Sequence, residues 1–464
     1  MKNNILRLGC LLFGLFLVLT VYLAYLQVWK GPALAANSYN RRFQEQEARI
    51  RRGTIYDIKG AVLARTEFSD GKGRRIYPEG TRTAHIVGYV SERYGRSGLE
   101  SFCDPYLLGM EGPDRVRNRI NNLLGREQAG GDVVLTIDSD LQGMAVELLG
   151  GRRGAAVLLD PRTGAVRAIV SSPGFNPNYL EETWPRLVND ESAPLMNRAA
   201  QGAYPPGSTF KIVTAAGALA GNPGVADMTF DCAGYIVADG YKLDDVAAHG
   251  KVDLRKALAV SCNSAFAQLG LNLGAEGFYR AVKAFGIREP ADLGIPVRAG
   301  TLAPPGEMTQ SELASSAIGQ GQILVSPLQM ALVAGAIANK GKIMKPYLVE
   351  SVRDSCGGTI HKAASHVWLD AAAPDIAEII KEGMVDAVRS GTAGAASVAG
   401  VQIAGKTGSA QNPQGMAHAW FIGFAPADSP RLAAAVILEN AGSGGAVAAP
   451  VAGRLLAYAV SRGY

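Results

Sequence analysis

Cysteine and histidine are scarce in this chain, which has five of each among its 464 residues. The histidines show no HExxH pattern or other close spacing of metal ligands. The cysteines lie far apart and form no CxxC pair, at Cys10, Cys103, Cys232, Cys262 and Cys356. We therefore expect neither a disulfide framework nor a metal site. A bridge between Cys232 and Cys262 stays open beside the simpler interpretation that both are small buried thiols.

Excess charge of either sign is also missing. The 46 basic and 41 acidic residues leave a net charge of +5, spread along the chain. Nucleic-acid-binding proteins gather basic residues on one face, so this balance indicates no nucleic-acid partner. A content of 48% hydrophobic and 19% charged residues is that of an ordinary globular protein.

Only one long apolar run occurs, at residues 8–26, where 19 consecutive residues carry no charge. That length spans a bilayer, which favours a retained membrane anchor. The segment Ala33-Leu34-Ala35 resembles a signal-peptidase site, so a cleaved signal peptide is the alternative. Lys2 and Arg7 precede the run and predict a short cytoplasmic tail. We expect a single-pass protein of the cell membrane whose remaining chain lies outside the cytoplasmic membrane.

The length predicts two or three folding units. We divide the chain into a tail and anchor at 1–30, a small irregular α+β pedestal at 31–130 and a main domain at 131–464. Residues 41–57 are rich in arginine and predict a polar helix followed by an extended segment that enters a turn at Lys59-Gly60. Many Gly, Pro and charged residues then interrupt the pattern up to Gly131.

The main domain shows strands at both ends and helices between them. Residues 131–149 predict a strand, an acidic N-cap at Asp138 or Asp140, and a helix. Further apolar segments predict a hairpin at 155–172, two strands at 419–425 and 431–440, and a closing helix at 449–464. Because residues 208–340 are mostly helical in pattern, we expect an α+β domain with an antiparallel sheet flanked by helices and a helical subdomain.

The segment GAYPPGSTFKIVTAAGALA, residues 202–220, carries the most informative chemistry. Pro-Pro-Gly cannot continue a helix, whereas the residues after it can, so Ser208 falls at a helix N-terminus. Lys211 follows three residues later and faces the same side. A serine hydroxyl is a weak nucleophile unless a base lies beside it, and a lysine acts as that base only if its pKa is lowered.

Two further motifs each carry little weight alone. Ser261-Cys262-Asn263 lies at a predicted break between two amphipathic stretches, where its polar groups either face a cleft or cap a helix. Lys406-Thr407-Gly408 precedes the strand at 419–425 and offers a cation, a hydroxyl and an unobstructed backbone to a carboxylate and an oxyanion. The simpler alternative for the second motif is a turn beside a strand.

The order of the three motifs is specific. SxxK, then SxN about 50 residues later, then KTG about 145 residues after that is a pattern shared by penicillin-binding proteins and class A β-lactamases. The chain resembles a class B penicillin-binding protein, a monofunctional transpeptidase with a membrane anchor. Supporting matches lie at Arg52–Asp57, Gly98–Glu100, Gly154–Asn178, Asn197-Arg198 and Trp420-Phe421. The resemblance implies a transpeptidase fold for 131–464 and a dimerisation-type pedestal.

The resemblance also implies roles for the first two motifs. Ser208 would form the acyl-enzyme, and Lys211 would deprotonate it. Ser261 would relay a proton to the leaving D-alanine, and Asn263 would bind both Lys211 and the substrate amide.

The third motif would bind the substrate. By the same resemblance, Lys406 and Thr407 would hold the terminal carboxylate, and Gly408 would keep the strand open. The backbone N–H groups of Ser208 and Ser409 would form the oxyanion hole.

The implied activity is peptidoglycan D,D-transpeptidation, which cross-links stem peptides, needs no cofactor and is inhibited covalently by β-lactams. A D,D-carboxypeptidase and a serine β-lactamase would use the same site. A different class of function is a noncatalytic β-lactam-binding scaffold for a membrane glycosyltransferase. The implied partners are peptidoglycan stem peptides, the cytoplasmic membrane and a polytopic glycosyltransferase.

Overall fold

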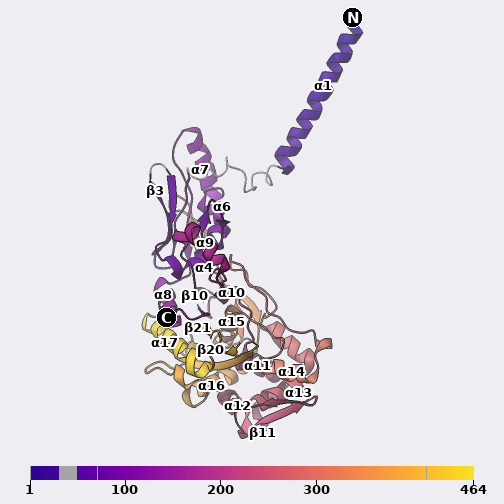
Figure 1. The fold of residues 1–464 in the computed structure, drawn as a ribbon, viewed down its shortest axis with the longest axis vertical. Coiled ribbons are helices and arrows are strands. Elements are labelled where there is room, and N and C mark those ends of the chain that lie inside the picture. Colours follow the sequence, from indigo (N-terminus) through magenta and orange to yellow (C-terminus); the bar gives the residue numbers. More distant parts are fainter. Residues whose placement is uncertain (1, 31–49, 70–71, 414) are drawn as a thin grey trace.

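The computed structural model describes residues 2–30, 50–69, 72–413 and 415–464. Helix α1 (Lys2–Tyr25), with the π-turn η1 (Leu26–Lys30), lies at one end of the molecule, the pedestal lies in the middle and the larger domain lies at the other end (Figure 1). The polar helix predicted before Ile50 falls outside the described residues.

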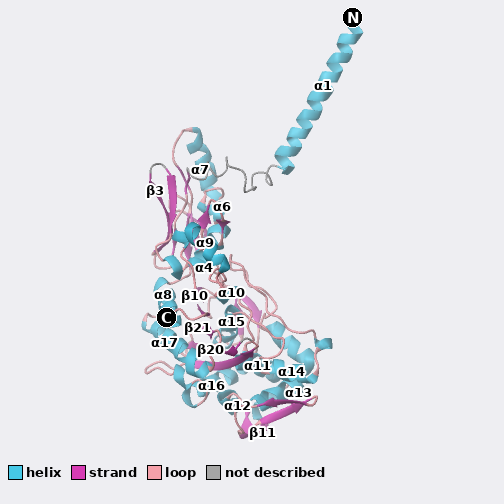
Figure 2. Ribbon diagram, viewed as in Figure 1, coloured by secondary structure: helices cyan, strands magenta, loops and turns pink. Residues whose placement is uncertain are grey.

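Short elements build the pedestal, as expected for a small irregular α+β domain (Figure 2). They are β1 (Ile50–Arg51), β2 (Ile55–Tyr56), β3 (Val62–Ser69), β4 (Lys72–Ile76), η2 (Gly80–Arg82), α4 (Ala84–Val87), β5 (Val90–Ser91), β6 (Gly95–Arg96), α5 (Gly98–Phe102), α6 (Asp104–Leu107), α7 (Gly112–Leu123) and β7 (Gln128–Ala129).

A six-stranded sheet joins the pedestal to the rest of the chain. Its order is β17-β16-β8-β2-β3-β4, with β8 (Asp132–Leu135), β16 (Val349–Arg353) and β17 (Thr359–Lys362) supplied from beyond residue 130. Strand β8 pairs in parallel with β2 and antiparallel with β16. The sheet therefore takes strands from both sides of the boundary predicted at 130/131.

A buried ion cluster holds the pedestal together. Glu100 is fully buried and accepts from Arg52 Nε at 2.7 Å and from Arg75 Nε at 2.6 Å. Arg52 also pairs with Asp104 at 2.5 Å. Burial alone would raise the pKa of Glu100, but the two guanidinium groups lower it below its ordinary value, so the carboxylate stays charged. Two of the sequence segments that carried the family resemblance, Arg52–Asp57 and Gly98–Glu100, meet in this cluster.

The core of the main domain is an antiparallel five-stranded sheet of order β10-β9-β21-β20-β19. Its strands are β9 (Gly154–Leu159), β10 (Val166–Ser172), β19 (Ala404–Asn412), β20 (Gly415–Ala425) and β21 (Leu432–Leu438). This confirms the predicted hairpin at 155–172 and the strand pair at 419–440. Helices α8 (Ser139–Leu149) and α17 (Ala449–Ser461) cover one face, and α15 (Pro327–Ala338) covers the other.

Burial on both faces explains the continuous apolar strands. In β9, Val157 and Leu159 join the core on the α15 side, whereas Ala156 and Leu158 join the core beneath α8 and α17. Asp138 is the N-cap of α8, and its carboxylate accepts from the backbone N–H groups of Asp140 and Leu141.

The region between the sheet strands is mainly helical, as predicted. It contains η3 (Pro177–Tyr179), α9 (Leu180–Asn189), α10 (Arg198–Gln201), η4 (Gly207–Phe210), α11 (Lys211–Gly221), η5 (Pro223–Asp227), α12 (Leu254–Val260), α13 (Asn263–Ala284), η6 (Pro305–Glu307), α14 (Gln310–Ala317), α15, α16 (Pro374–Ser390) and η7 (Gly394–Ala396).

Three small strand pairs interrupt these helices. They are β11 (Thr229–Cys232) with β14 (Gly250–Asp253), β12 (Tyr235–Ala238) with β13 (Tyr241–Asp244), and β15 (Lys342–Met344) with β18 (Val367–Asp370). The β12–β13 hairpin turns at Asp239-Gly240, where both φ angles are positive, at 47° and 74°. An Asp-Gly pair between apolar segments favours this turn, so the sequence did carry a hairpin signal there.

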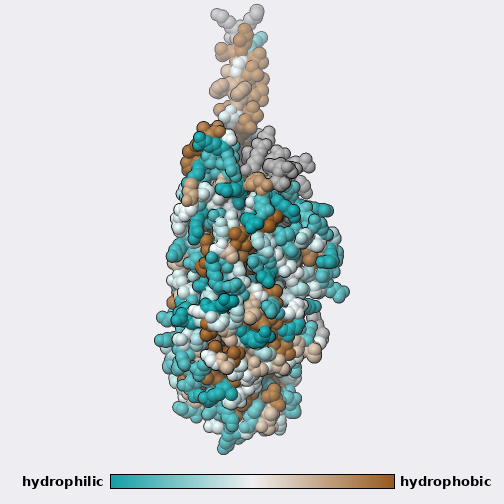
Figure 3. Space-filling view, turned by 90° about the vertical axis from the view of Figure 1, so that its left-hand side faces the viewer, coloured by the Kyte–Doolittle hydropathy of each residue, from teal (hydrophilic) through white to brown (hydrophobic). Residues whose placement is uncertain are grey.

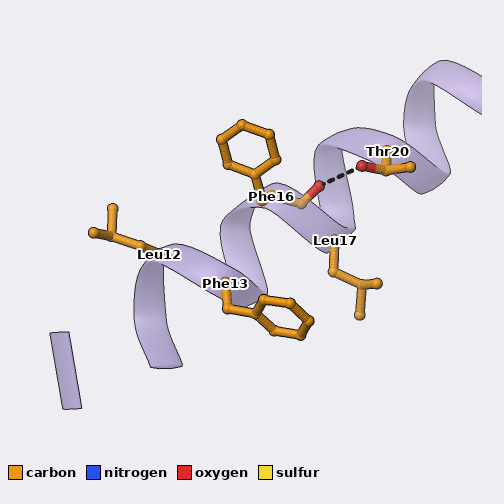
Figure 4. Close-up of a pocket in the computed structure, with 5 residues that line it drawn as sticks. All are labelled: Leu12, Phe13, Phe16, Leu17 and Thr20. Atoms are coloured by element: carbon orange, nitrogen blue, oxygen red, sulfur yellow. Dashed lines mark hydrogen bonds between the residues drawn. The ribbon is translucent and has the colours of Figure 1, made fainter. Parts of the chain in front are cut away.

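Helix α1 has the features expected of a membrane anchor. None of its apolar window is buried, whereas the other apolar helix of comparable length among the described residues, Gly444–Ser461, is half buried in the core. Its surface is hydrophobic over most of its length (Figure 3). The shallow hollow in Figure 4 lies between side chains of α1, where the Thr20 hydroxyl donates to the Phe16 carbonyl at 2.8 Å. The helix thus satisfies this hydroxyl internally, as a lipid environment requires.

Replacing Glu100 by Gln should lower the free energy of unfolding by about 3–5 kcal/mol, because the substitution leaves two buried guanidinium groups without their carboxylate. Urea-induced unfolding of the detergent-solubilised protein measures this change. The matched control is Glu67→Gln, which removes an exposed pair with Arg65 and should cost less than about 1 kcal/mol. Equal losses in the two variants would contradict the structural role of the cluster.

Candidate functional site

Ser208 lies in the 3-10 turn η4, which leads directly into α11, as predicted for a helix N-terminus. Its side chain is half-buried, and its hydroxyl has no hydrogen-bond partner within the described ranges. Gly207 before it adopts φ +55°, a left-handed conformation that glycine accommodates without strain. The hydroxyl therefore lies at a defined place at the start of α11 and makes no hydrogen bond to another described group of the protein.

Lys211 connects the first motif to the second. It is fully buried, and its Nζ lies 2.7 Å from Asn263 Oδ1, 2.5 Å from the Ser261 carbonyl oxygen and 3.2 Å from Ser261 Oγ. Burial lowers the pKa of Lys211 to about 7, although the nearby Asp245 carboxylate raises it. A lysine in this state is partly neutral at physiological pH and can accept a proton.

Ser261 occupies a strained backbone position. It is the C-cap of α12 with φ +63°, a conformation that costs energy for a residue with a Cβ. Cys262 follows as the N-cap of α13, and its sulfur accepts from the Ala265 N–H at 3.4 Å. The predicted break between two helices is confirmed, and it turns the side chains on both sides of Cys262 toward Lys211.

The third motif lies on β19, which pairs only with β20 and is the edge strand of the five-stranded sheet. Lys406 is fully buried, and its Nζ donates to the Thr407 carbonyl at 3.0 Å. Burial, followed by the charge of Lys211, holds the pKa of Lys406 well below its ordinary value. Thr407 Oγ1 donates to Thr392 Oγ1 at 2.9 Å, and Ser409 is exposed.

Gly408 lets β19 lie against the turn that carries Ser208. A Cβ on Gly408 would lie 2.9 Å from the Pro206 carbonyl oxygen and 3.2 Å from the Thr209 nitrogen. Gly319 is constrained more tightly on another side, because a Cβ there would lie 2.0 Å from the carbonyl oxygen of Gly207. Because Gly408 and Gly319 have no side chains, the turn that carries Ser208 can lie close to its neighbours.

A charged network behind the turn was not identified from the sequence. Glu439 accepts from Arg198 Nε at 2.8 Å and from the Tyr204 hydroxyl at 2.7 Å, and Arg153 pairs with its other oxygen at 2.8 Å. Trp420 Nε1 donates to the Pro205 carbonyl at 3.0 Å. The segments Asn197-Arg198 and Trp420-Phe421 were noted only as family matches, and their contacts with the chain around Ser208 explain why they accompany it.

Cys262 of the second motif and three residues near it could hold a metal ion. The ligand atoms of Cys232, Asp245, His249 and Cys262 all lie within 4.8 Å of one another. The two thiols approach one oxygen of Asp245, at 3.3 Å from Cys232 and 3.2 Å from Cys262. Burial would raise the pKa of Asp245, but hydrogen bonds led by the Ser264 N–H lower it to about 2. Sequence spacing gave no sign of the cluster, because its members come from a strand, a loop and a helix cap.

Two family models match the chain. Residues 154–457 match the penicillin binding protein transpeptidase domain, and residues 52–133 match the penicillin binding protein A dimerisation domain. The first contains Ser208, Ser261 and Lys406, and the second contains Arg52 and Glu100.

Named relatives agree with these matches. The peptidoglycan D,D-transpeptidase PbpA of Mycolicibacterium smegmatis is 34% identical over 493 aligned positions, which cover 100% of both chains. The peptidoglycan D,D-transpeptidase MrdA of Acinetobacter baumannii is 32% identical over 81% of this chain and 64% of the relative.

The fold is also similar to solved structures. The penicillin G acyl-enzyme complex of penicillin-binding protein A from M. tuberculosis has a TM-score of 0.82 and 34% identity, covering 89% of this chain and 99% of that chain. The D,D-transpeptidase domain of a peptidoglycan glycosyltransferase from Eggerthella lenta has a TM-score of 0.82 and 33% identity, covering 90% and 99%. Sequence relatedness over the full length and a shared fold together show that the chain belongs to the class B penicillin-binding proteins.

Proposed function

We propose that this protein is a peptidoglycan D,D-transpeptidase that cross-links stem peptides through an acyl-enzyme on Ser208. The observation that carries the proposal is the buried amine of Lys211, which is one helical turn from Ser208 and in hydrogen-bond contact with Ser261 and Asn263. The names of the full-length relatives and the acyl-enzyme structures of penicillin-binding protein A support the same chemistry.

Acylation begins when neutral Lys211 takes the proton of the Ser208 hydroxyl as the oxygen attacks the carbonyl before the terminal D-alanine. Backbone N–H groups of Ser208 and Ser409 would stabilise the oxyanion. Collapse of the tetrahedral intermediate breaks the peptide bond, and Ser261 passes a proton to the leaving D-alanine amine. An amine from a second stem peptide then attacks the ester, releases Ser208 and forms the cross-link.

Lys406 and Thr407 would select the substrate by its terminal carboxylate. Burial, followed by the charge of Lys211, lowers the pKa of Lys406 while the site is empty. A substrate carboxylate that pairs with Lys406 and accepts from Thr407 would stabilise the protonated form of Lys406. Asn263 has a further donor, which already reaches the Asp244 carbonyl at 3.0 Å, so its amide is oriented before the substrate arrives.

We also propose how the parts of the chain are arranged relative to the membrane. Residues 1–30 form the tail and single membrane anchor, 31–130 the pedestal and 131–464 the transpeptidase domain outside the cytoplasmic membrane. The exposed apolar surface of α1 supports the anchor. The resemblance to class B proteins supports a polytopic membrane glycosyltransferase as the partner that supplies glycan strands. A carboxypeptidase, a β-lactamase and a noncatalytic scaffold are the alternatives, and the lifetime of the penicillin adduct measured below separates the β-lactamase from the others.

Replacing Ser208 by Ala should abolish the covalent adduct that the protein forms with penicillin G, because no other residue supplies the nucleophile. Intact mass spectrometry over several hours measures the adduct, with the exposed Ser461→Ala as the matched control that should label fully. A stable adduct on Ser208 would establish the acyl-enzyme chemistry and disfavour a β-lactamase, whereas a rapidly lost one would favour a β-lactamase. Labelling of the Ser208→Ala protein would disprove the assignment.

Acylation should depend on pH through Lys211. Because its pKa is about 7, the amine becomes protonated below that pH and loses its ability to accept a proton. The second-order rate constant for acylation by penicillin G should fall about tenfold for each pH unit below 7 and level off above pH 8. Stopped-flow measurements between pH 5 and 9 test this, and a flat profile across that range would assign the base to another group.

Replacing Gly408 by Ala should slow acylation by at least tenfold while the protein stays folded. The added methyl group would force β19 away from the turn at Pro206 and Thr209 and disturb the geometry of the oxyanion hole. The control is Gly306→Ala, where a Cβ meets nothing within 4 Å. Equal acylation rates for the Gly408→Ala and control proteins would show that this close approach is unnecessary.

A further inference from the structure

Helix α7 turns its polar side toward the protein. Its buried residues are Asp114 and Asn118. Asp114 accepts from the Ser355 backbone N–H at 2.8 Å, and Asn118 exchanges hydrogen bonds with the backbone of Ala129 at 2.8 and 3.1 Å. A surface helix ordinarily buries its apolar face, so the outward orientation of the apolar face of α7 requires an explanation.

The outward side of α7 is aliphatic. Val116, Ile120 and Leu123 follow the i, i+4, i+7 spacing that places side chains on one face, and Leu124 lies just beyond the helix. Their exposed fractions are 62%, 51%, 83% and 57%. We call these four side chains the α7 stripe. Figure 3 shows hydrophobic surface among hydrophilic atoms at the height where α7 lies in Figure 1.

Three arginines accompany the α7 stripe. Arg115 and Arg119 lie on the outward half of the helix, beside the stripe, and Arg126 lies in the following loop, all exposed. Within the described part of the chain, none of the three has an ion-pair partner. The flanking acids Glu111 and Glu127 lie outside the helix. The outward face thus combines aliphatic side chains with positive charge.

The end of α7 is also where the chain arrives from the anchor. Strand β1, the first described element after residue 30, pairs in parallel with β7, which begins five residues after Leu123. The 19 residues at 31–49 between η1 and β1 can extend to about 65 Å at most, so this end of the ectodomain lies within reach of the bilayer. Figure 1 shows α7 at the end of the pedestal away from the main domain.

We propose that the α7 stripe and its arginines form a second contact with the membrane, in which aliphatic side chains enter the headgroup region and guanidinium groups bind anionic lipid phosphates. Charge complementarity favours this occupant. A 12-residue helix is about 18 Å long and presents roughly 180 Å², far below the roughly 800 Å² per partner of a stable protein interface. A contact this small suffices when α1 already holds the chain at the bilayer.

The test uses the full chain, with Cys10→Ala and Cys356→Ala, reconstituted into vesicles that contain 30% phosphatidylglycerol in phosphatidylcholine. A nitroxide label is attached to the cysteine of the Leu123→Cys variant. The ratio of its collision rates with oxygen and with a nickel chelate shows whether the label lies in lipid or in water. We expect this ratio to be at least threefold higher than at Val246→Cys, an exposed position of the main domain. A label after Leu17→Cys verifies that α1 is inserted.

The charge reversals Arg115→Glu, Arg119→Glu and Arg126→Glu, combined in one chain, should return the label at 123 to the water-like ratio of position 246. Acylation of Ser208 by penicillin G should be unchanged, which shows that the altered protein is folded. A water-like ratio at 123 without the reversals would overturn the proposal. Dipolar broadening between labels at 123 would overturn it as well, because the α7 stripe would then contact a second copy of the chain.

Discussion

Burial of one amine organises the catalytic region. An unpaired ammonium in a protein interior costs several kcal/mol, so the fold must supply acceptors for Lys211 or keep it neutral. It does both, since Ser261 and Asn263 contact the amine while burial lowers its pKa to about 7. The strained backbone at Ser261 and the helix break beside it follow from this requirement, because a continuous helix could not aim a carbonyl, a hydroxyl and an amide at one nitrogen.

The remaining catalytic geometry depends on backbone segments that approach one another closely. The turn that carries Ser208 lies between β19 and the loop at Gly319, and on both sides the contact is made at a glycine. Protein interiors are packed too tightly for such segments to tolerate even one extra methyl group. Because β19 is the edge strand, one side pairs with β20 and the other side is open. The strand is therefore held rigidly by the sheet and is still accessible to a substrate.

The pedestal and the main domain are stabilised differently. The main domain covers both faces of its sheet with apolar helices, whereas the pedestal encloses the Glu100 carboxylate between two guanidinium groups. The pedestal also buries apolar side chains such as Ile55, Leu63 and Leu99, and the paired charges add directional contacts between its short elements. Hydrogen bonding also orients α7, whose inward face is polar and whose outward face is left for the membrane.

Local sequence determined much of this protein. The length of the uncharged apolar run predicted the anchor. Apolar spacing predicted the hairpin at β9 and β10, the closing helix and the helical middle, because it reports which side of an element is buried. The order of SxxK, SxN and KTG indicated the family. The sequence also placed Ser208 at a helix start, since Pro-Pro-Gly ends one conformation and begins another.

Only the tertiary structure decided which distant residues meet. The pairing of Glu439 with Arg198, the approach of Gly408 to Pro206, and the cluster around Asp245 involve partners from separate elements. Periodicity describes one element at a time and carries no information about such contacts. For the same reason the sequence could not show that the sheet of the pedestal takes strands from residues 349–362, or that α7 presents its apolar side to the outside. Those outcomes depend on how whole elements pack together, and packing is settled by the complete fold.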